Sequence, residues 1–140
     1  ATLSLKKIGT ALPRCLNLDL SDAPDIAQTI AVSCLGLQIP CDLTGLHTLK
    51  IKETDRLVAL QNDIKKLGST VEITDNSLYL NPPTALNSKV NIATYNDHRM
   101  AMAFAPLALK THLYIEDAEV VSKSYPDFWK NLEMLGVEIH

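Results

Sequence analysis

Residues 16–36 have the sequence LNLDLSDAPDIAQTIAVSCLG, in which a strand pattern leads directly into a helix pattern. Apolar and polar residues alternate over 16–20, with the period of a half-buried strand. Residues 21–24 then offer capping side chains and a proline suited to a first helical turn. Apolar residues recur at helical spacing over 26–35, and Gly36 is expected to end the helix. The succession of strand and helix predicts an α/β fold.

Similar patterns continue along the rest of the chain, where Pro82 and Pro83 separate two halves. Apolar stripes indicate helices, and glycines at 68 and 136 are expected to end two of them. The predicted elements are a strand ending at 50–52, a helix over 57–67, a hairpin of 71–73 and 78–80, a helix from Asp97 that Pro106 should kink or shorten, a strand over 113–115, a helix over 126–135 and a last strand over 137–139.

The second half of the chain resembles the first at a spacing of about 70 residues. Asp25 then matches Asp97, and Lys52 matches Lys123. A period of this length is too long for a solenoid repeat and suits a duplicated α/β block. The alternative is that any two αβ segments look alike.

Composition limits the class of protein. The chain has 140 residues, of which 46% are apolar and 21% charged, as in one compact soluble domain. A net charge of −3 argues against a surface for nucleic acid. Three cysteines without a C-x-x-C motif argue against a disulfide framework or a zinc site and favour a reducing cytosol. No apolar run reaches the roughly 20 residues of a membrane span, and no signal peptide is visible. Because Ala1 is not methionine, we expect the true start to lie upstream.

The first charged segment is LKIKETDRL, residues 49–57, at a predicted helix start. The free N–H groups and partial positive charge of a helix N-terminus attract anions, and Lys52 and Arg56 add full charges there. This arrangement predicts a receptor for a phosphate or carboxylate. The alternative is a solvated helix start capped by Asp55 or Glu53.

The second charged segment is ATYNDHRMAM, residues 93–102, which also precedes an apolar helix. Asn96 or Asp97 can cap this helix, and Arg99 falls in its first turn. A cation there is unfavourable for the helix itself, so an anionic partner explains Arg99 better than a merely exposed position. A lone histidine such as His98 is more often structural than catalytic.

Charged residues at or near predicted helix starts are expected to gather on one edge of the sheet. Cations there would hold a substrate with two or more anionic groups, and carboxylates could move protons. The residues concerned are Asp25, Lys52, Glu53, Arg56, Arg99 and Lys123.

These segments resemble a known family. KETDR (residues 52–56) and TYNDHRMAM (residues 94–102) are similar to the two signature stretches of 5-enolpyruvylshikimate-3-phosphate synthases. Residues 24–25, 65–68 and 123–128 stand in the order found in that family. The resemblance covers nearly the whole chain from about residue 16.

The resemblance implies a two-domain enzyme built from six βαβαββ units, three in each domain, with the site in the cleft between domains. Residues 1–140 would be the C-terminal part of one enolpyruvyl transferase domain, with approximate repeats at 16–83 and 89–140. The N-terminal part of the same enzyme, which would complete the site, is missing from the chain. The fragment alone is therefore expected to be inactive.

The resemblance also implies a reaction. An enolpyruvyl group would pass from phosphoenolpyruvate to the 5-hydroxyl of shikimate 3-phosphate by addition and elimination, with release of phosphate, in the shikimate pathway of aromatic amino-acid biosynthesis. No metal or organic cofactor, nucleic acid or membrane is implied, and the location would be cytoplasmic.

Individual roles follow from the resemblance. Asp25 resembles the carboxylate that binds the shikimate hydroxyls and accepts a proton, and Glu53 resembles the group that protonates the phosphoenolpyruvate methylene. Lys52 would contact the shikimate phosphate and share in proton transfer, and Thr48 stands where many relatives have asparagine near this ligand. The residues that would hold phosphoenolpyruvate are Arg56, Arg99 and Lys123, with His98 beside them.

Three other interpretations of the sequence remain. One is the related transferase that acts on UDP-N-acetylglucosamine, although the pairing of KETDR with NDHR argues against it. Another is a non-catalytic anion-binding or interaction module with the same fold. The last is a structural domain whose charges are only solvated.

Overall fold

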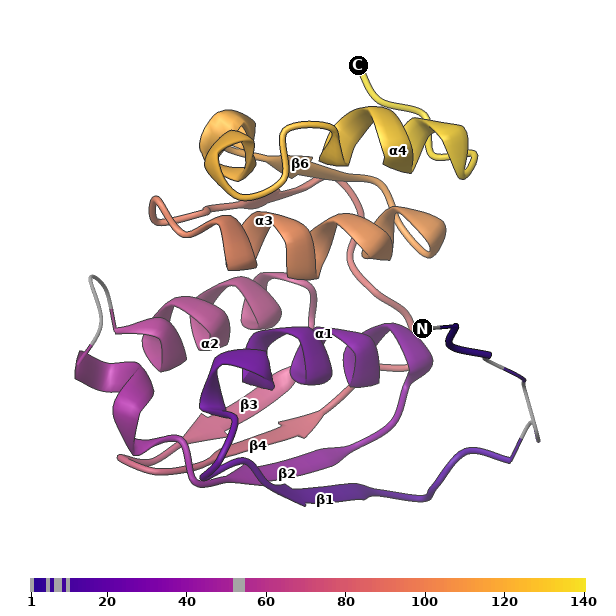
Figure 1. Ribbon diagram of the computed structural model, residues 1–140. Helices are drawn as coiled ribbons and strands as arrows, with labels where there is room; N and C mark the ends of the chain where they lie inside the picture. The colour runs from indigo at the N-terminus through magenta and orange to yellow at the C-terminus, as the bar shows by residue number, and fades with distance from the viewer. Residues whose placement is uncertain (1, 5, 7–8, 10, 52–54) are drawn as a thin grey trace.

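The first half of the chain forms a four-stranded sheet in the computed structural model (Figure 1), which describes residues 2–4, 6, 9, 11–51 and 55–140. Strands β1 and β2 are parallel, and the other neighbours in the order β1-β2-β4-β3 are antiparallel. The elements are β1 (Leu16–Asp19), the 3-10 turn η1 (Pro24–Ile26), α1 (Ala27–Leu37), β2 (Cys41–Thr44), the 3-10 turn η2 (His47–Ile51), α2 (Arg56–Lys66), β3 (Thr70–Ile73) and β4 (Leu78–Asn81). The strands and α-helices therefore follow in βαβαββ order, as expected for the fold.

The second half is smaller and has a parallel pair of strands, β5 and β6. Asp97 caps its first helix, which gives way to a 3-10 turn at the residue before Pro106, as predicted. The elements are β5 (Val90–Ile92), α3 (His98–Phe104), the 3-10 turn η3 (Ala105–Leu109), β6 (Leu113–Ile115), the 3-10 turn η4 (Ala118–Lys123) and α4 (Phe128–Met134).

The elements are stacked in layers. Figure 1 shows α1 and α2 on one face of the four-stranded sheet, α3 above them, β6 above α3 and α4 at the top. Helix α3 packs on α1, and α2 contacts both β3 and β5. No helix among the described residues has the length and apolar character needed to cross a bilayer.

Helix α1 is largely apolar because it packs against the sheet on one side and against α3 on another. Ala27, Ala31 and Leu35 are completely buried between the sheet and α3. Gly36 lies inside the helix, at a position where a Cβ would come within 2.9 Å of the Leu107 side chain. The prediction that Gly36 ends the helix was therefore wrong, and Gln38, with a left-handed φ of 58°, takes that place.

Two of the predicted strands, the one ending at 50–52 and the one over 137–139, were wrong. Residues 50 and 51 belong to η2, because Leu46 and Leu49 are both buried at the spacing of one helical turn. The strand that precedes α2 is β2, which was not predicted, and neither was the short β5. Residues 137–139 are not a strand, because no strand in the described part of the chain pairs with them. The 71–73 and 78–80 hairpin, the 57–67 helix and the 113–115 strand are confirmed.

Gly45 follows β2, where the carboxyl ends of β1 and β2 lie side by side. Its φ is +77°, and a Cβ would lie 2.3 Å from the Ser21 amide nitrogen and 2.5 Å from an Asp19 carboxylate oxygen. Gly45→Ala is therefore expected to lower the free energy of unfolding by about 3 kcal/mol in urea denaturation. Gly136→Ala is the control, since Gly136 has a φ of +93° but open space around it. Equal losses in the two variants would contradict the proposed clash.

An ion pair between a buried carboxylate and a partly exposed lysine joins the two halves of the chain. The Asp63 side chain on α2 is completely buried, and Lys66 Nζ lies 2.5 Å from its Oδ1. Lys66 Nζ also donates to the carbonyl of Asn91 at 3.0 Å, and the Ala93 amide donates to Asp63 Oδ1 at 3.4 Å. Helix α2 of the first half thus holds the backbone at the end of β5 in the second.

Asp63→Asn is expected to remove a pH-dependent loss of stability. Burial raises the pKa of the Asp63 carboxyl above its ordinary value of 3.8, and Glu116 adds to this, against the lowering effects of Lys66 and the Ala93 amide. The folded protein therefore binds this proton more tightly than the unfolded chain. The stability that this bound proton adds to the folded protein is complete at pH values below the ordinary pKa and is lost as pH rises through the raised pKa. Melting temperature against pH should fall for the wild type relative to the variant across this interval, and parallel curves would contradict this.

Candidate functional site

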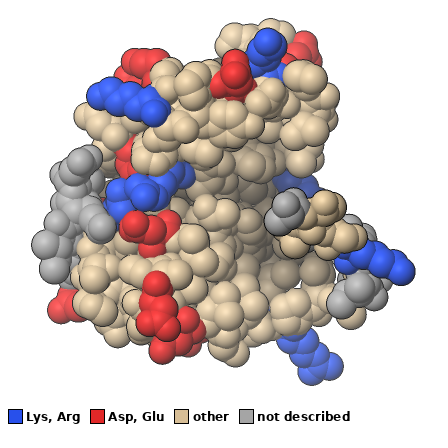
Figure 2. All heavy atoms as spheres, viewed as in Figure 1, with Lys and Arg blue, Asp and Glu red and all other residues tan. Residues whose placement is uncertain are grey.

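A polar pocket of about 690 Å³ opens where the second half of the chain meets the start of α2. Its cations come from three elements that lie far apart in the sequence, namely Arg56 of α2, Arg99 of α3 and Lys123 of η4. Figure 2 shows blue Lys and Arg atoms directly beside red Asp and Glu atoms on this face. The structure therefore brings together the three predicted cations that lie within its described residues.

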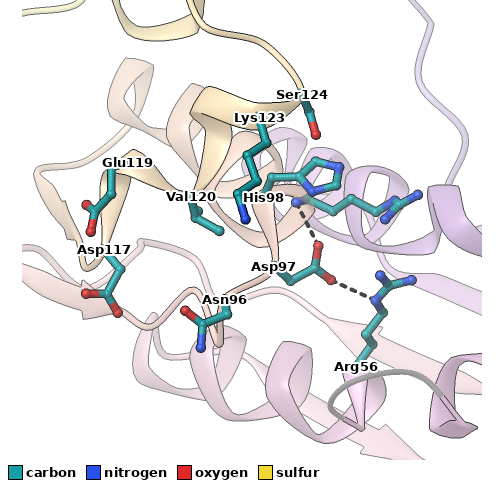
Figure 3. Close-up of a pocket in the computed structure, with 10 residues that line it drawn as sticks. Arg56, Asn96, Asp97, His98, Asp117, Glu119, Val120, Lys123 and Ser124 are labelled. Atoms are coloured by element: carbon teal, nitrogen blue, oxygen red, sulfur yellow. Dashed lines mark hydrogen bonds and ion pairs between the residues drawn. The ribbon is translucent and has the colours of Figure 1, made fainter.

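Arg56 is the first residue of α2, and local sequence fixes that start. The Asp55 side chain caps the helix by accepting hydrogen bonds from the amides of Leu57 and Val58 at 3.1 and 3.2 Å. The Arg56 side chain is only 11% exposed and bridges two carboxylates. Its Nη1 lies 3.0 Å from Asp25 Oδ1, and its Nε lies 2.7 Å from Asp97 Oδ2 (Figure 3). Both interactions are charge-assisted hydrogen bonds, and the one with Asp97 is mostly shielded from solvent because both of its side chains are largely buried.

Asp97 has two functions at once. Its Oδ1 accepts a hydrogen bond from the Arg99 amide at 2.9 Å and so caps α3, while its Oδ2 binds Arg56. Gln28 of α1, which is buried, adds a 3.3 Å hydrogen bond to the same Oδ2. The carboxylate therefore holds α1, α2 and α3 together at the wall of the pocket.

Asp25 completes an ion-pair network with the two arginines. It lies in η1, and its Oδ2 is 3.4 Å from Arg99 Nη2 while its Oδ1 binds Arg56. The Asp25 side chain is 42% exposed and so remains accessible from solvent. The structure thus confirms that Asp25, Arg56 and Arg99 all lie at helix starts and close together. It also shows that protein carboxylates neutralise both guanidinium groups.

Lys123 does not lie at a helix start as expected, because it is the last residue of η4. It still lines the pocket, and Figure 3 shows its side chain extending from η4 toward Asn96 and Asp97. Within the part of the chain that the structure describes, its ammonium group has no ion pair. His98 lines the same wall. Lys123 is therefore the cation best placed to meet an incoming anion.

Thr48 lies in η2, which packs against η1, the turn that contains Asp25. The Thr48 hydroxyl oxygen is buried without a hydrogen-bond partner in the structure. Such a group costs free energy unless it binds something, which fits a contact with a ligand. The predicted residues Lys52 and Glu53 lie outside the described residues.

Several residues of this region were not predicted as site residues. The sequence indicated Asp97 as a helix cap and as the repeat equivalent of Asp25, but not as a site residue. Gln28 is a polar residue in a largely apolar helix, and this was the signal that could have indicated it. Asp117 and Glu119, which line the far end of the pocket (Figure 3), gave no signal. No group of three metal-binding side chains occurs in residues 2–4, 6, 9, 11–51 and 55–140.

Comparison with known sequences gives consistent results. A sequence model of a family described as EPSP synthase (3-phosphoshikimate 1-carboxyvinyltransferase) matches residues 5–132. The 3-phosphoshikimate 1-carboxyvinyltransferase of Bacteroides fragilis strain YCH46 is 44% identical over 140 residues, covering 98% of this chain and 34% of the relative. The protein of that name from Edwardsiella ictaluri is 38% identical over 121 residues, covering 86% of this chain and 28% of the relative.

Solved structures support the fold. An EPSP synthase from Acinetobacter baumannii superposes with a TM-score of 0.76 at 24% sequence identity, covering 84% of this chain and 28% of the other. At that identity the likeness concerns the fold alone. The chain spans about a third of the length of the curated relatives it matches.

Proposed function

The chain belongs to the EPSP synthase family, and on this basis we propose that the protein containing it transfers the enolpyruvyl group of phosphoenolpyruvate to the 5-hydroxyl of shikimate 3-phosphate. The observation that carries the proposal is the convergence of Arg56, Arg99 and Lys123 on one pocket, with Asp25 tied to both arginines. The two substrates together carry two phosphates and two carboxylates, which suits a pocket of this kind.

The cations are assigned to phosphoenolpyruvate. The planar guanidinium groups of Arg56 and Arg99 suit bidentate binding of its phosphate and carboxylate, and Lys123 adds a mobile point charge from the opposite wall. Because Asp25 and Asp97 already engage the arginines, the substrate must replace part of this network when it binds. His98 is a further neighbour of the same anion.

The carboxylates are assigned to proton transfer. In the addition step, the 5-hydroxyl oxygen bonds to C2 of phosphoenolpyruvate, its proton passes to Asp25, and Glu53 protonates the C3 methylene. In the elimination step, the bond from C2 to the phosphate oxygen breaks, a proton leaves C3 and the double bond is restored as phosphate departs. Lys52 and Thr48 are assigned to shikimate 3-phosphate. The half-exposed Asp25 carboxylate, in the η1 turn that packs against η2, supports its assignment to proton transfer.

The chain is proposed to act as part of a longer protein. Residues 1–140 would form the C-terminal part of one domain, with repeats at 16–83 and 89–140, completed by an N-terminal part that supplies the rest of the site. Apolar side chains that are exposed or half-exposed support this, namely Ile26 at the end of η1 and Ile30 and Leu37 on α1. On its own the chain would be inactive.

A cytoplasmic location is proposed as well. Cys15, Cys34 and Cys41 are all free thiols, which is typical of a reducing compartment. The proposed substrates are phosphorylated metabolites, which is consistent with this location.

The proposal can be tested with the full-length protein by measuring phosphate release from phosphoenolpyruvate. Release that requires shikimate 3-phosphate, together with formation of its enolpyruvyl ether, is the expected result. Release with UDP-N-acetylglucosamine instead would identify the related transferase. Binding of both substrates by calorimetry without turnover would indicate a non-catalytic module, and no binding at all would refute the proposal.

A further inference from the structure

Asp63 and Lys66 lie outside the pocket, yet they hold the backbone that leads into it. Lys66 Nζ binds the Asn91 carbonyl, and Asp63 Oδ1 accepts from the Ala93 amide and from Lys66. The two contacts lie on either side of Ile92, the last residue of β5, which is completely buried. The end of this strand is thus fixed on α2 by two side chains of opposite charge.

The path from Ala93 to the pocket is short and stiff. Thr94 is 1% exposed, and its carbonyl accepts a hydrogen bond from the Asp97 amide at 2.9 Å. Tyr95 and Asn96 between them have left-handed φ values of 53° and 56°, which non-glycine residues adopt only where the surroundings hold them. A displacement of Ala93 would therefore be transmitted to Asp97 rather than absorbed by the turn.

Helix α2 touches the same segment a second time, at its other end. Arg56 binds Asp97 Oδ2 from the first turn of α2, and Asp63 lies seven residues further along, about 10 Å away at 1.5 Å per residue. The two attachments set how segment 91–97 lies along α2. The distance between the Arg56 and Arg99 guanidinium groups depends on this alignment, since Arg99 follows directly after the turn.

Packing alone would not require an aspartate at position 63, and burying its carboxylate costs free energy. Its side chain is completely buried, and its Oδ2 has no hydrogen-bond partner in the structure. An apolar residue of similar size would fill the same space without desolvating a charge. A carboxylate paired with a partly exposed lysine, in contrast, fixes direction and register, which apolar contacts do not.

We propose that Asp63 and Lys66 are positioning residues for the phosphoenolpyruvate pocket, which align segment 91–97 on α2 and thereby place Asp97 and Arg99 relative to Arg56. This inference rests on the proposed function for its substrate but not for its geometry. Neither residue touches the pocket, so their effect on binding would be indirect.

The experiment compares three variants of the full-length protein. Lys66→Met removes the contact with the Asn91 carbonyl and leaves Asp63 unpaired. A variant combining Asp63→Leu with Lys66→Met removes both charges and keeps the interior filled, so it remains informative if the single variant does not fold. Lys65→Met is the matched control, because Lys65 is the neighbouring, exposed lysine of the same helix.

Two measurements separate positioning from plain stability. We expect the double variant to raise KM for phosphoenolpyruvate about tenfold, with a smaller change in kcat and with control-like values for Lys65→Met. Hydrogen–deuterium exchange should accelerate at the amides of residues 93–99 while the four-stranded sheet stays protected. A double variant with control-like KM and exchange would overturn the proposal, whatever its melting temperature.

The two proposals can fail separately. A wild-type protein that performs no enolpyruvyl transfer would refute the proposed function. The exchange comparison would then decide the positioning role by itself. Faster exchange confined to residues 93–99 in the double variant would support it, and unchanged exchange would overturn it.

Discussion

Replacing Arg56 by methionine is expected to lower kcat/KM for phosphoenolpyruvate by about a thousandfold in the full-length protein. The substitution removes a planar cation that no neighbouring lysine can replace geometrically. It also leaves Asp97, whose side chain is only 9% exposed, without its 2.7 Å ion-pair partner. A buried carboxylate that loses its cation destabilises the protein, here by about 3 kcal/mol. Steady-state kinetics and urea denaturation measure the two effects separately.

A second substitution distinguishes binding from folding. Combining Arg56→Met with Asp97→Asn removes the unpaired charge, so stability should recover while kcat/KM stays low. Lys65→Met, which removes an exposed cation from the same helix, should leave both quantities unchanged. An Arg56→Met protein whose kcat/KM stayed within threefold of the wild type would exclude Arg56 from the site.

Replacing Asp25 by asparagine is expected to lower kcat by about a thousandfold without raising KM for phosphoenolpyruvate. Asparagine keeps the shape of the side chain but neither accepts a proton at this position nor balances a charge. Because Asp25 binds Arg56 at 3.0 Å and Arg99 at 3.4 Å, its neutralisation leaves both guanidinium groups freer to take the substrate. KM for phosphoenolpyruvate should therefore stay constant or fall, which steady-state kinetics with both substrates would show.

Asp22→Asn is the matched control for this change, since Asp22 is an exposed carboxylate in the turn just before η1. It should leave kcat and KM as they are. A parallel rise in KM and loss of kcat for Asp25→Asn would point to a purely structural role in the network. A full kcat would remove Asp25 from the proposed proton transfer.

Much of the fold could be predicted because the local patterns were strong. The apolar stripe of α2 and the hairpin of 71–73 and 78–80 depend on neighbouring residues alone, and both are confirmed. The failures came where distant contacts decide. Gly36 was predicted to end a helix, but the helix continues past it and Leu107 of the second half packs closely against it. Residues 137–139 have a strand pattern, but no strand in the described part of the chain pairs with them.

The same division holds for the site. Helix starts and charges indicated Asp25, Arg56 and Arg99 correctly as neighbours, because helix N-termini follow from local capping signals. The sequence did not show that Asp97 would bind Arg56, because the two residues lie on different helices and meet only after α3 has packed. Nor did it indicate Gln28, whose hydrogen bond to Asp97 spans 69 positions.

The internal ion-pair network has a consequence for how fast a substrate arrives. Among the described residues at or beside the pocket, three cations face four carboxylates, namely Arg56, Arg99 and Lys123 against Asp25, Asp97, Asp117 and Glu119. Seen from beyond a Debye length of roughly 10 Å, these charges nearly cancel, so they exert little long-range pull on an approaching dianion. Encounter through this wall would then be governed by ordinary diffusion and be insensitive to ionic strength. Selection of the ligand would begin only on contact, as it displaces carboxylates from the arginines.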